Sequence, residues 1–122
     1  MSDFGRRIRP YVDSEILSAR KAESRGQPDI AFSYLERAHV LGQASTVEHV
    51  RAHWHMLLWS IRQRNVREGL GQLLRIVGAA ISTAVGLVPQ GNTGGSNVSP
   101  FKSMPLPSEL ASRINEVRTS RR

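Results

Sequence analysis

The stretch YLERAHVLGQASTVEHVRAHWHM, residues 34–56, spans the end of one predicted helix, a tight turn and the start of the next. Gly42 is typical of the position at which a helix ends. Ser45 and Glu48 form an S-x-x-E capping box, which predicts that a new helix begins near residue 46. We therefore expect two antiparallel helices here, and all four histidines of the chain lie within the same stretch.

Helical patterns continue on both sides of this hairpin. Apolar residues recur at i, i+3 and i+4, Pro28 suits the first turn of a helix, and Gly26 and Gly42 act as helix stops. The sequence therefore predicts an all-α fold. We expect helices over residues 9–25, 28–42, 46–64, 66–87 and 108–117.

The first two predicted helices resemble a tetratricopeptide-type (TPR) hairpin in the spacing of their small residues. Gly26, Ala31 and Ala38 follow the G-x4-A-x6-A spacing of that repeat. The chain holds about one such unit, over residues 12–41, and one repeat cannot build a solenoid. We interpret the spacing as packing geometry, and we expect a four-helix domain that starts with a TPR-like hairpin.

The composition changes after Pro89. The stretch QGNTGGSNVSPFKSMPLP, residues 90–107, is rich in glycine, serine and proline, which argues against a helix or a central strand. We expect an extended strap that lies over the helices. The predicted organisation is a flexible N-terminus at 1–8, a helical domain at 9–89, the strap at 90–107, and a short helix with a basic tail at 108–122.

The longest apolar run, IVGAAISTAVGLVP at residues 76–89, is shorter than the roughly 20 residues that cross a bilayer. We expect a buried helix there and no transmembrane segment. The N-terminal residues lack the apolar core of a secretory signal. The chain has no cysteine, which excludes disulfides, thiolate metal ligands and cysteine nucleophiles. A cytoplasmic location is the simplest expectation.

The formal net charge of +7 comes from 15 arginines and 2 lysines against 10 acidic residues. Arginine favours contacts with phosphate and carboxylate groups, so an anionic partner such as a nucleic acid is one interpretation. Many of the arginines gather at the two ends of the chain, however, with no aromatic residues interleaved among them. We interpret these ends as solvated tails, which argues against a nucleic-acid partner.

Two pairs of potential metal ligands lie on consecutive predicted helices. Glu36 and His39 form an E-x-x-H pair, and His49 and His53 form an H-x3-H pair. Each spacing places both members of a pair on one helix face. When the turn is centred near residues 43 and 44, position 39 faces position 48 or 49. We therefore expect the two pairs to lie at the same height in the hairpin.

Glu15 reaches this height as well when the first hairpin is folded about residue 27. A mixture of imidazole and carboxylate groups suits a divalent metal such as iron, zinc or copper. A mononuclear site, an unusual dinuclear site and a homodimer that shares ligands are all consistent with a single E-x-x-H motif. His55 lies off the shared face and is interpreted as structural. The candidate metal ligands are Glu15, Glu36, His39, His49 and His53.

These observations favour a small metal-binding protein. An open coordination position on a redox-active metal would permit oxygen activation, as in a non-haem iron oxidase. A closed site would suit metal homeostasis, resistance or sensing. The alternative is a non-catalytic helical module that binds protein or nucleic acid. No nucleophile elbow or Ser-His-Asp order indicates covalent hydrolysis.

The sequence also resembles a bacterial family of short proteins that is classed only as a domain of unknown function. This resemblance extends over about residues 12–110 and implies a single structural unit with no established activity. It also implies an association with metal-handling systems. The blocks that carry the resemblance are LERAHVLGQ at 35–43, HVRAHW at 49–54, GQLLRIV at 71–77 and GNTGGSNVSPFKSMPLP at 91–107.

Overall fold

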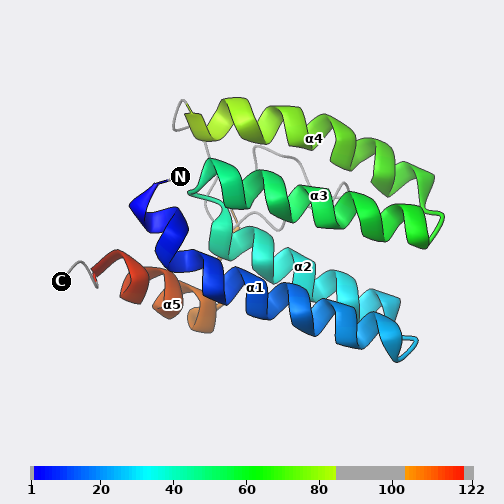
Figure 1. The fold of residues 1–122 in the computed structure, drawn as a ribbon, viewed down its shortest axis with the longest axis horizontal. Helices are drawn as coiled ribbons and strands as arrows, with labels where there is room; N and C mark the ends of the chain where they lie inside the picture. Colours follow the sequence, from blue (N-terminus) through cyan, green and yellow to red (C-terminus); the bar gives the residue numbers. More distant parts are fainter. Residues whose placement is uncertain (1, 85–103, 120–122) are drawn as a thin grey trace.

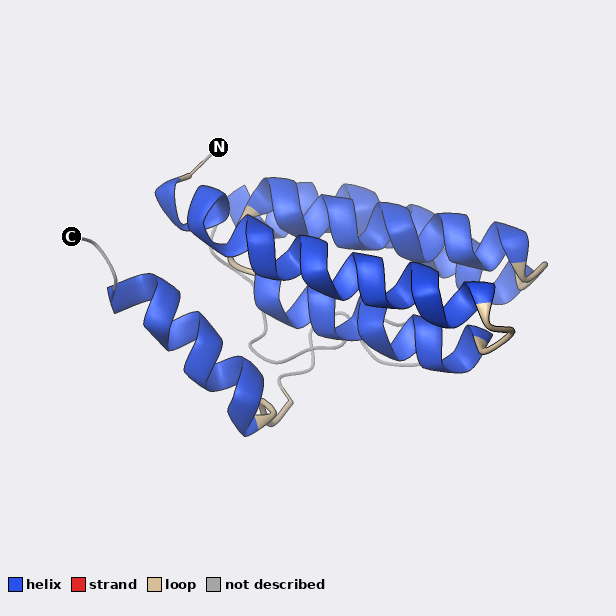
Figure 2. Ribbon diagram, turned by 60° about the horizontal axis from the view of Figure 1, so that its bottom comes forward, coloured by secondary structure: helices blue, strands red, loops and turns tan. Residues whose placement is uncertain are grey.

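The computed structural model describes residues 2–84 and 104–119, and every regular element in these two ranges is an α-helix (Figure 1). Figure 2 shows only helices and connecting loops over the same residues. The prediction of an all-α fold is therefore confirmed. The helices are α1 (Asp3–Ser24), α2 (Pro28–Gly42), α3 (Thr46–Arg62), α4 (Val66–Ala84) and α5 (Ser108–Thr119).

Successive helices pack side by side across the molecule (Figure 1). α1 packs against α2, α2 against α3, and α3 against α4. α5 lies against α1 and α2, at the other side of the molecule from α4 (Figure 1). The main apolar core is thus built from α1, α2, α3 and α5, with Ile8, Val12 and Met56 among its fully buried side chains.

α1 begins six residues earlier than predicted. The Ser2 hydroxyl accepts a hydrogen bond of 3.0 Å from the Gly5 backbone N–H, which caps the helix. Ile8 is fully buried in the core, so the first turns also contribute apolar packing. Residues 3–8, which were expected to be flexible, therefore form part of α1 because a cap and a buried side chain stabilise them.

The basic residues near the C-terminus help to hold α5 on α1. The Arg113 guanidinium lies 4.4 Å from the centre of the Tyr11 ring, and that of Arg118 lies 5.6 Å from the Phe4 ring. Both are cation–π contacts. These two arginines were expected to be part of a solvated tail, but aromatic residues far away in the sequence provide their partners.

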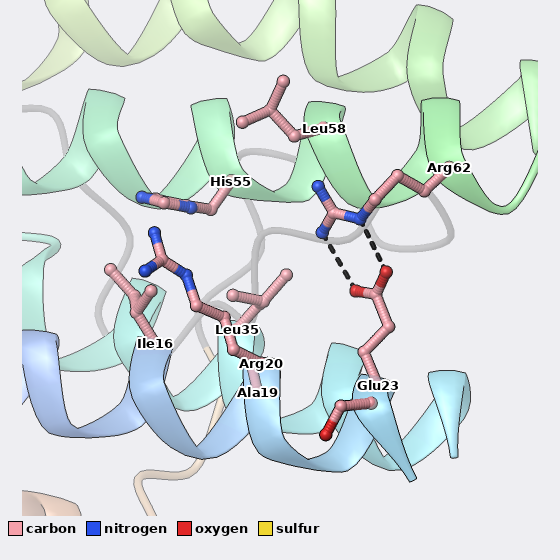
Figure 3. Close-up of a pocket in the computed structure, with 9 residues that line it drawn as sticks. Ile16, Ala19, Arg20, Glu23, Leu35, His55, Leu58 and Arg62 are labelled. Carbon is pink, nitrogen blue, oxygen red and sulfur yellow. Dashed lines mark hydrogen bonds and ion pairs between the residues drawn. The ribbon is translucent and has the colours of Figure 1, made fainter. Parts of the chain in front are cut away.

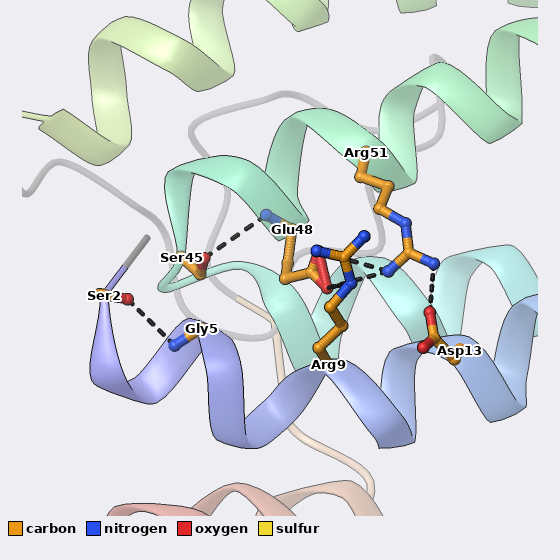
Figure 4. A network of polar contacts seen from close by, with 7 residues as sticks. All are labelled: Ser2, Gly5, Arg9, Asp13, Ser45, Glu48 and Arg51. Carbon is orange, nitrogen blue, oxygen red and sulfur yellow. Dashed lines mark hydrogen bonds and ion pairs between the residues drawn. The ribbon is translucent and has the colours of Figure 1, made fainter.

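The turn between α2 and α3 brings the two backbones into close approach. A Cβ atom built at Gly42 would lie 2.7 Å from the Cβ atom of Glu48. The Ser45 hydroxyl accepts the Glu48 backbone N–H at 3.4 Å, as the capping box predicts (Figure 4). Only glycine fits at position 42 without a shift of α3, and this contact fixes the register of the two helices.

Replacement of Gly42 by alanine should therefore lower the free energy of unfolding by about 1–3 kcal/mol, the usual cost of overpacking a tight contact. Gly78→Ala is the matched control, because a Cβ atom there meets nothing within 4 Å. That control should be neutral or slightly stabilising, since alanine favours a helix more than glycine does. Chemical denaturation measures both, and equal effects of the two substitutions would contradict the close approach at Gly42.

α4 differs from the expectation of a buried helix. Val77 is 63% exposed and Ile81 is 62% exposed, whereas Ala79 of the same apolar run is buried. Gln72, in contrast, is fully buried on the side that meets α3. The prediction fails for these two large side chains because α4 turns its small and polar side chains towards α3. Residues 85–103, which include most of the predicted strap, lie outside the described residues.

No helix among the described residues is long and apolar enough to cross a membrane.

Candidate metal centre

Three of the five predicted ligands come together in one buried cluster. His39, His49 and His53 each offer a ring nitrogen, and these three nitrogens lie within 4.8 Å of one another. The ring centroids are 4.7 Å apart for His39 and His49, 4.6 Å for His39 and His53, and 5.1 Å for His49 and His53. All three side chains are at most 6% exposed.

The helices position these rings in a simple way. His39 lies in the last turn of α2, and His49 and His53 are one turn apart on the facing side of α3. The close approach at Gly42 sets the height of α3 against α2, so position 39 faces position 49. This part of the predicted register is confirmed by the ring contacts.

The spacing of the nitrogens suits a metal after a small adjustment of the rings. In a tetrahedral zinc site with Zn–N distances of about 2.0–2.1 Å, two ligand nitrogens lie roughly 3.3 Å apart. The three nitrogens here are separated by no more than 4.8 Å. Rotations of the imidazole rings can close the difference, so three nitrogen ligands could converge on a single ion.

A buried chain of hydrogen bonds orients His53. The Nδ1 atom of His53 lies 2.5 Å from Oε1 of Gln72, and Nε2 of Gln72 donates to Oε2 of Glu68 at 2.8 Å. A carboxylate only accepts, so the Gln72 amide must turn its nitrogen to Glu68 and its oxygen to His53. His53 therefore carries its proton on Nδ1, which leaves Nε2 as the nitrogen that can bind a metal.

The environment keeps the imidazoles of His49 and His53 neutral near pH 7. Burial, and to a smaller extent the neighbouring His53, lower the pKa of His49 to about 3. Burial is also the main reason that the pKa of His53 falls to about 4, with the charge of Arg75 acting in the same direction. A neutral imidazole has the lone pair that a metal requires.

Comparison with known protein families assigns the chain to one of them. The family described as "protein of unknown function (DUF3703)" matches residues 6–114, which is most of the sequence. The chain belongs to DUF3703. The resemblance predicted from the sequence motifs is therefore confirmed at the level of the family. No curated protein and no solved structure matches the chain.

Glu15 is not part of the histidine cluster in this DUF3703 protein. Its carboxylate forms a bidentate ion pair with Arg37, at 2.8 Å and 3.0 Å. Arg37 also binds Glu109 of α5, and these two carboxylates raise its pKa. The position of Glu15 in the sequence predicts its height along the hairpin, but it does not predict the direction in which the side chain leaves α1.

Glu36 is also outside the group of ligand atoms that converge. Its side chain is half-buried, whereas His39 one turn later is buried. Residues at i and i+3 share a helix face but differ by about 60° around the helix axis. This rotation is enough to separate a carboxylate at the edge of the interface from an imidazole within it.

Glu48 is the buried carboxylate next to the cluster in the sequence, and arginine contacts neutralise its charge (Figure 4). Arg51 donates to it at 2.9 Å, and the guanidinium of Arg9 lies 3.9 Å away. Arg51 also contacts Asp13 of α1. This network joins α1 to α3 beside the site, and it keeps Glu48 engaged with cations.

His55 lies outside the cluster, as predicted. It lines a cavity of about 330 Å³ between α1, α2 and α3, together with Arg20 and Leu58 (Figure 3). At the edge of this cavity Arg62 binds Glu23 through two hydrogen bonds of 2.6 Å and 2.9 Å. Burial and the nearby arginines lower the pKa of His55.

Gln72 and Glu68 were not among the predicted site residues. A signal for them exists in the sequence, because they are separated by one helical turn and lie opposite the apolar stripe of α4. A polar pair on the side of an amphipathic helix that lacks the leucines would ordinarily be assigned to solvent. Because the apolar run was interpreted as the buried side of the helix, Gln72 and Glu68 were expected to face solvent.

Proposed function

We propose that this DUF3703 protein binds one divalent metal ion through His39, His49 and His53. The observation that carries the proposal is the convergence of three buried ring nitrogens within 4.8 Å. Two further features support it. The neutral state of His49 and His53 makes their lone pairs available, and the Gln72–Glu68 chain selects the tautomer of His53.

The donor set favours zinc or copper over iron. Imidazole suits all three metals, but non-haem iron sites commonly add a carboxylate to two histidines. No carboxylate belongs to the converging group among the described residues. Three neutral nitrogens resemble the protein ligands of a zinc site in which a water molecule completes the tetrahedron.

Three ligands hold one ion, so the mononuclear alternative is the one we propose. The burial of the cluster suits tight retention of the ion, and we propose a role in metal homeostasis, resistance or sensing. An iron oxidase has weaker support, since Glu15 binds Arg37 instead of joining the cluster. The TPR-like character of the α1–α2 hairpin, the four-helix domain and the cytoplasmic location remain predictions.

Binding of nucleic acid has little support from the placement of the arginines. Arg37, Arg51 and Arg62 each pair with at least one carboxylate, which reduces the charge available to phosphates. We therefore retain the prediction that nucleic acid is not the partner.

Isothermal titration of the metal-free protein with Zn²⁺ and with Cu²⁺ tests the proposal. We expect one ion per chain, and we expect His49→Ala to weaken binding by at least about 100-fold because one of three ligands is lost. His55→Ala is the matched control: it removes an imidazole two residues from His53 but outside the cluster, and binding should persist.

A loss of binding that is equal in the His49→Ala and His55→Ala variants would contradict the assignment of the ligands. Failure of the wild-type chain to bind either ion would contradict the proposed function itself. Circular dichroism of each variant shows that the helices are retained, so that unfolding is not mistaken for the loss of a ligand.

A further inference from the structure

α4 has its two faces in the opposite arrangement from an ordinary surface helix. One side carries six large aliphatic residues, each more than half exposed. A surface helix normally turns such a stripe towards the core and its polar residues towards solvent. We call these six residues the outer face of α4. The outer face consists of Val66, Leu70, Leu73, Leu74, Val77 and Ile81, between 51% and 78% exposed.

The opposite side of α4 meets α3 with polar and small residues. Gln72 is fully buried there and binds His53, and Glu68 binds Gln72. A Cβ atom at Gly69 would lie 3.0 Å from the Ser60 hydroxyl, so glycine allows this side to approach α3. Among the described helices α4 contacts α3 alone, and no α4 residue belongs to the main apolar core.

The spacing along the outer face is that of a helix that pairs with another helix. Val66, Leu70, Leu73 and Val77 follow steps of four, three and four residues, and the exposed Ala80 continues the repeat. This 3.5-residue period is the pattern of a coiled-coil seam. The single step to Leu74 widens the stripe on one side.

We propose that the outer face of α4 packs against the same face of a second copy of this chain, with the two α4 helices antiparallel about a twofold axis near Leu73 and Leu74. An isologous contact of this kind requires one patch that complements itself. A continuous stripe of aliphatic side chains meets this requirement, because apolar packing needs no pairing of opposite groups.

The charges near the outer face favour the antiparallel orientation. No acidic or basic residue lies within the stripe, and Arg67 at its edge is near the N-terminal end of α4. A parallel pair would place Arg67 beside its own copy. In an antiparallel pair this arginine faces the end of the partner helix around residues 80–84, which contains no charged residue.

The exposed apolar area is close to what a stable dimer needs. Six aliphatic side chains at this level of exposure present on the order of 600 Å² per copy, which reaches the upper end of ordinary surface patches. A standard interface buries about 800 Å² per partner, so the outer face with its flanking residues provides most of the required area.

A segment of the same chain matches this surface less well than a second α4 does. Residues 90–103, QGNTGGSNVSPFKS, contain only Val98 and Phe101 as apolar side chains besides a proline, which are too few to interdigitate with six aliphatic residues. A second α4 offers the same 3.5-residue repeat and the same length. The proposal does not depend on the metal, because the outer face and the histidine cluster lie on different sides of α4.

Sedimentation equilibrium of the metal-free chain in a chelator tests the proposal. We expect a mass of twice the 13.6 kDa of one chain for the wild type and the single-chain mass for Leu73→Glu/Val77→Glu. The matched control, Leu17→Glu/Ile30→Glu, changes two aliphatic residues of similar exposure on α1 and α2 and should remain dimeric.

An introduced cysteine gives a second readout that does not require a destabilising charge. The chain has no cysteine, so oxidised Leu73→Cys should form a covalent dimer near the twofold axis, whereas Leu17→Cys should not. A monomeric wild type would overturn the proposal. So would a dimer that persists in the Leu73→Glu/Val77→Glu variant, or a monomer that binds phosphatidylglycerol vesicles through α4.

Discussion

The metal-free protein is expected to lose stability steeply as the pH falls from 6.5 to about 4.5. His49 and His53 are buried as neutral imidazoles, with pKa values lowered from 6.5 to about 3 and about 4. The unfolded chain takes up a proton at each histidine as the pH passes below 6.5, while the folded chain does not. Protonation therefore stabilises the unfolded state in this range.

The size of the effect follows from the number of sites. Each imidazole that stays neutral in the fold costs up to about 1.4 kcal/mol for every pH unit below 6.5. Two such groups lower the free energy of unfolding by on the order of 4 kcal/mol between pH 6.5 and pH 4.5. For a small domain this is a large share of the total stability.

Urea denaturation at pH 7.0, 5.5 and 4.5 measures this slope. The variant His49→Gln/His53→Gln should show a much flatter dependence, because glutamine does not titrate. Carboxylates contribute mainly below this range, and the lowered pKa of Glu109 beside Arg37 places its own titration lower still. An equally steep loss of stability in the double variant would show that other groups cause it.

Gln72→Leu should weaken metal binding by about 10–100-fold, although Gln72 offers no ligand atom to the cluster. Its Oε1 accepts the Nδ1 proton of His53, and Glu68 fixes the amide from the other side. Without this acceptor His53 is free to change its tautomer and its ring angle. Loss of a partner that orients a ligand histidine typically reduces affinity by this amount.

A readout specific to orientation separates this role from simple packing. Nitrogen NMR of the His53 ring should show a proton on Nδ1 in the wild type and a mixture of tautomers in Gln72→Leu. Gln63→Leu makes the same chemical change at an exposed position and should alter affinity less than about two-fold. An unchanged tautomer together with unchanged affinity in Gln72→Leu would contradict an orienting role for Gln72.

Local sequence signals predicted the bounds of the helices more reliably than they predicted which side of each helix is buried. The capping box at Ser45 and the stops at Gly26 and Gly42 each act within one turn, so the bounds of α2 and the start of α3 agree with the structure. The start of α1 was not predicted, because the cap at Ser2 precedes the periodic apolar residues. The burial of Ile8 in the core, which stabilises these first turns, depends on tertiary packing.

In the site, too, the positions of residues along the helices were easier to predict than the directions of their side chains. The E-x-x-H pair and the H-x3-H pair could be placed at one height from the length of the turn, and the contact of His39 with His49 agrees with this placement. Glu15 could not be excluded from the spacing alone, because its partner Arg37 lies on another helix. Gln72 was not predicted because a helix ordinarily buries its apolar side. In a single copy of this chain α4 instead exposes its large aliphatic residues and buries Gln72.

Three histidines are proposed to hold one ion, and X-ray absorption of the zinc-loaded protein tests this proposal most directly. The expected spectrum has a shell of nitrogen or oxygen atoms at about 2.0–2.1 Å and multiple scattering from three imidazole rings. The triple variant His39→Ala/His49→Ala/His53→Ala, treated with zinc in the same way, should lack that scattering. A shell dominated by oxygen with at most one imidazole, or the same spectrum from the triple variant, would contradict a metal centre at this cluster.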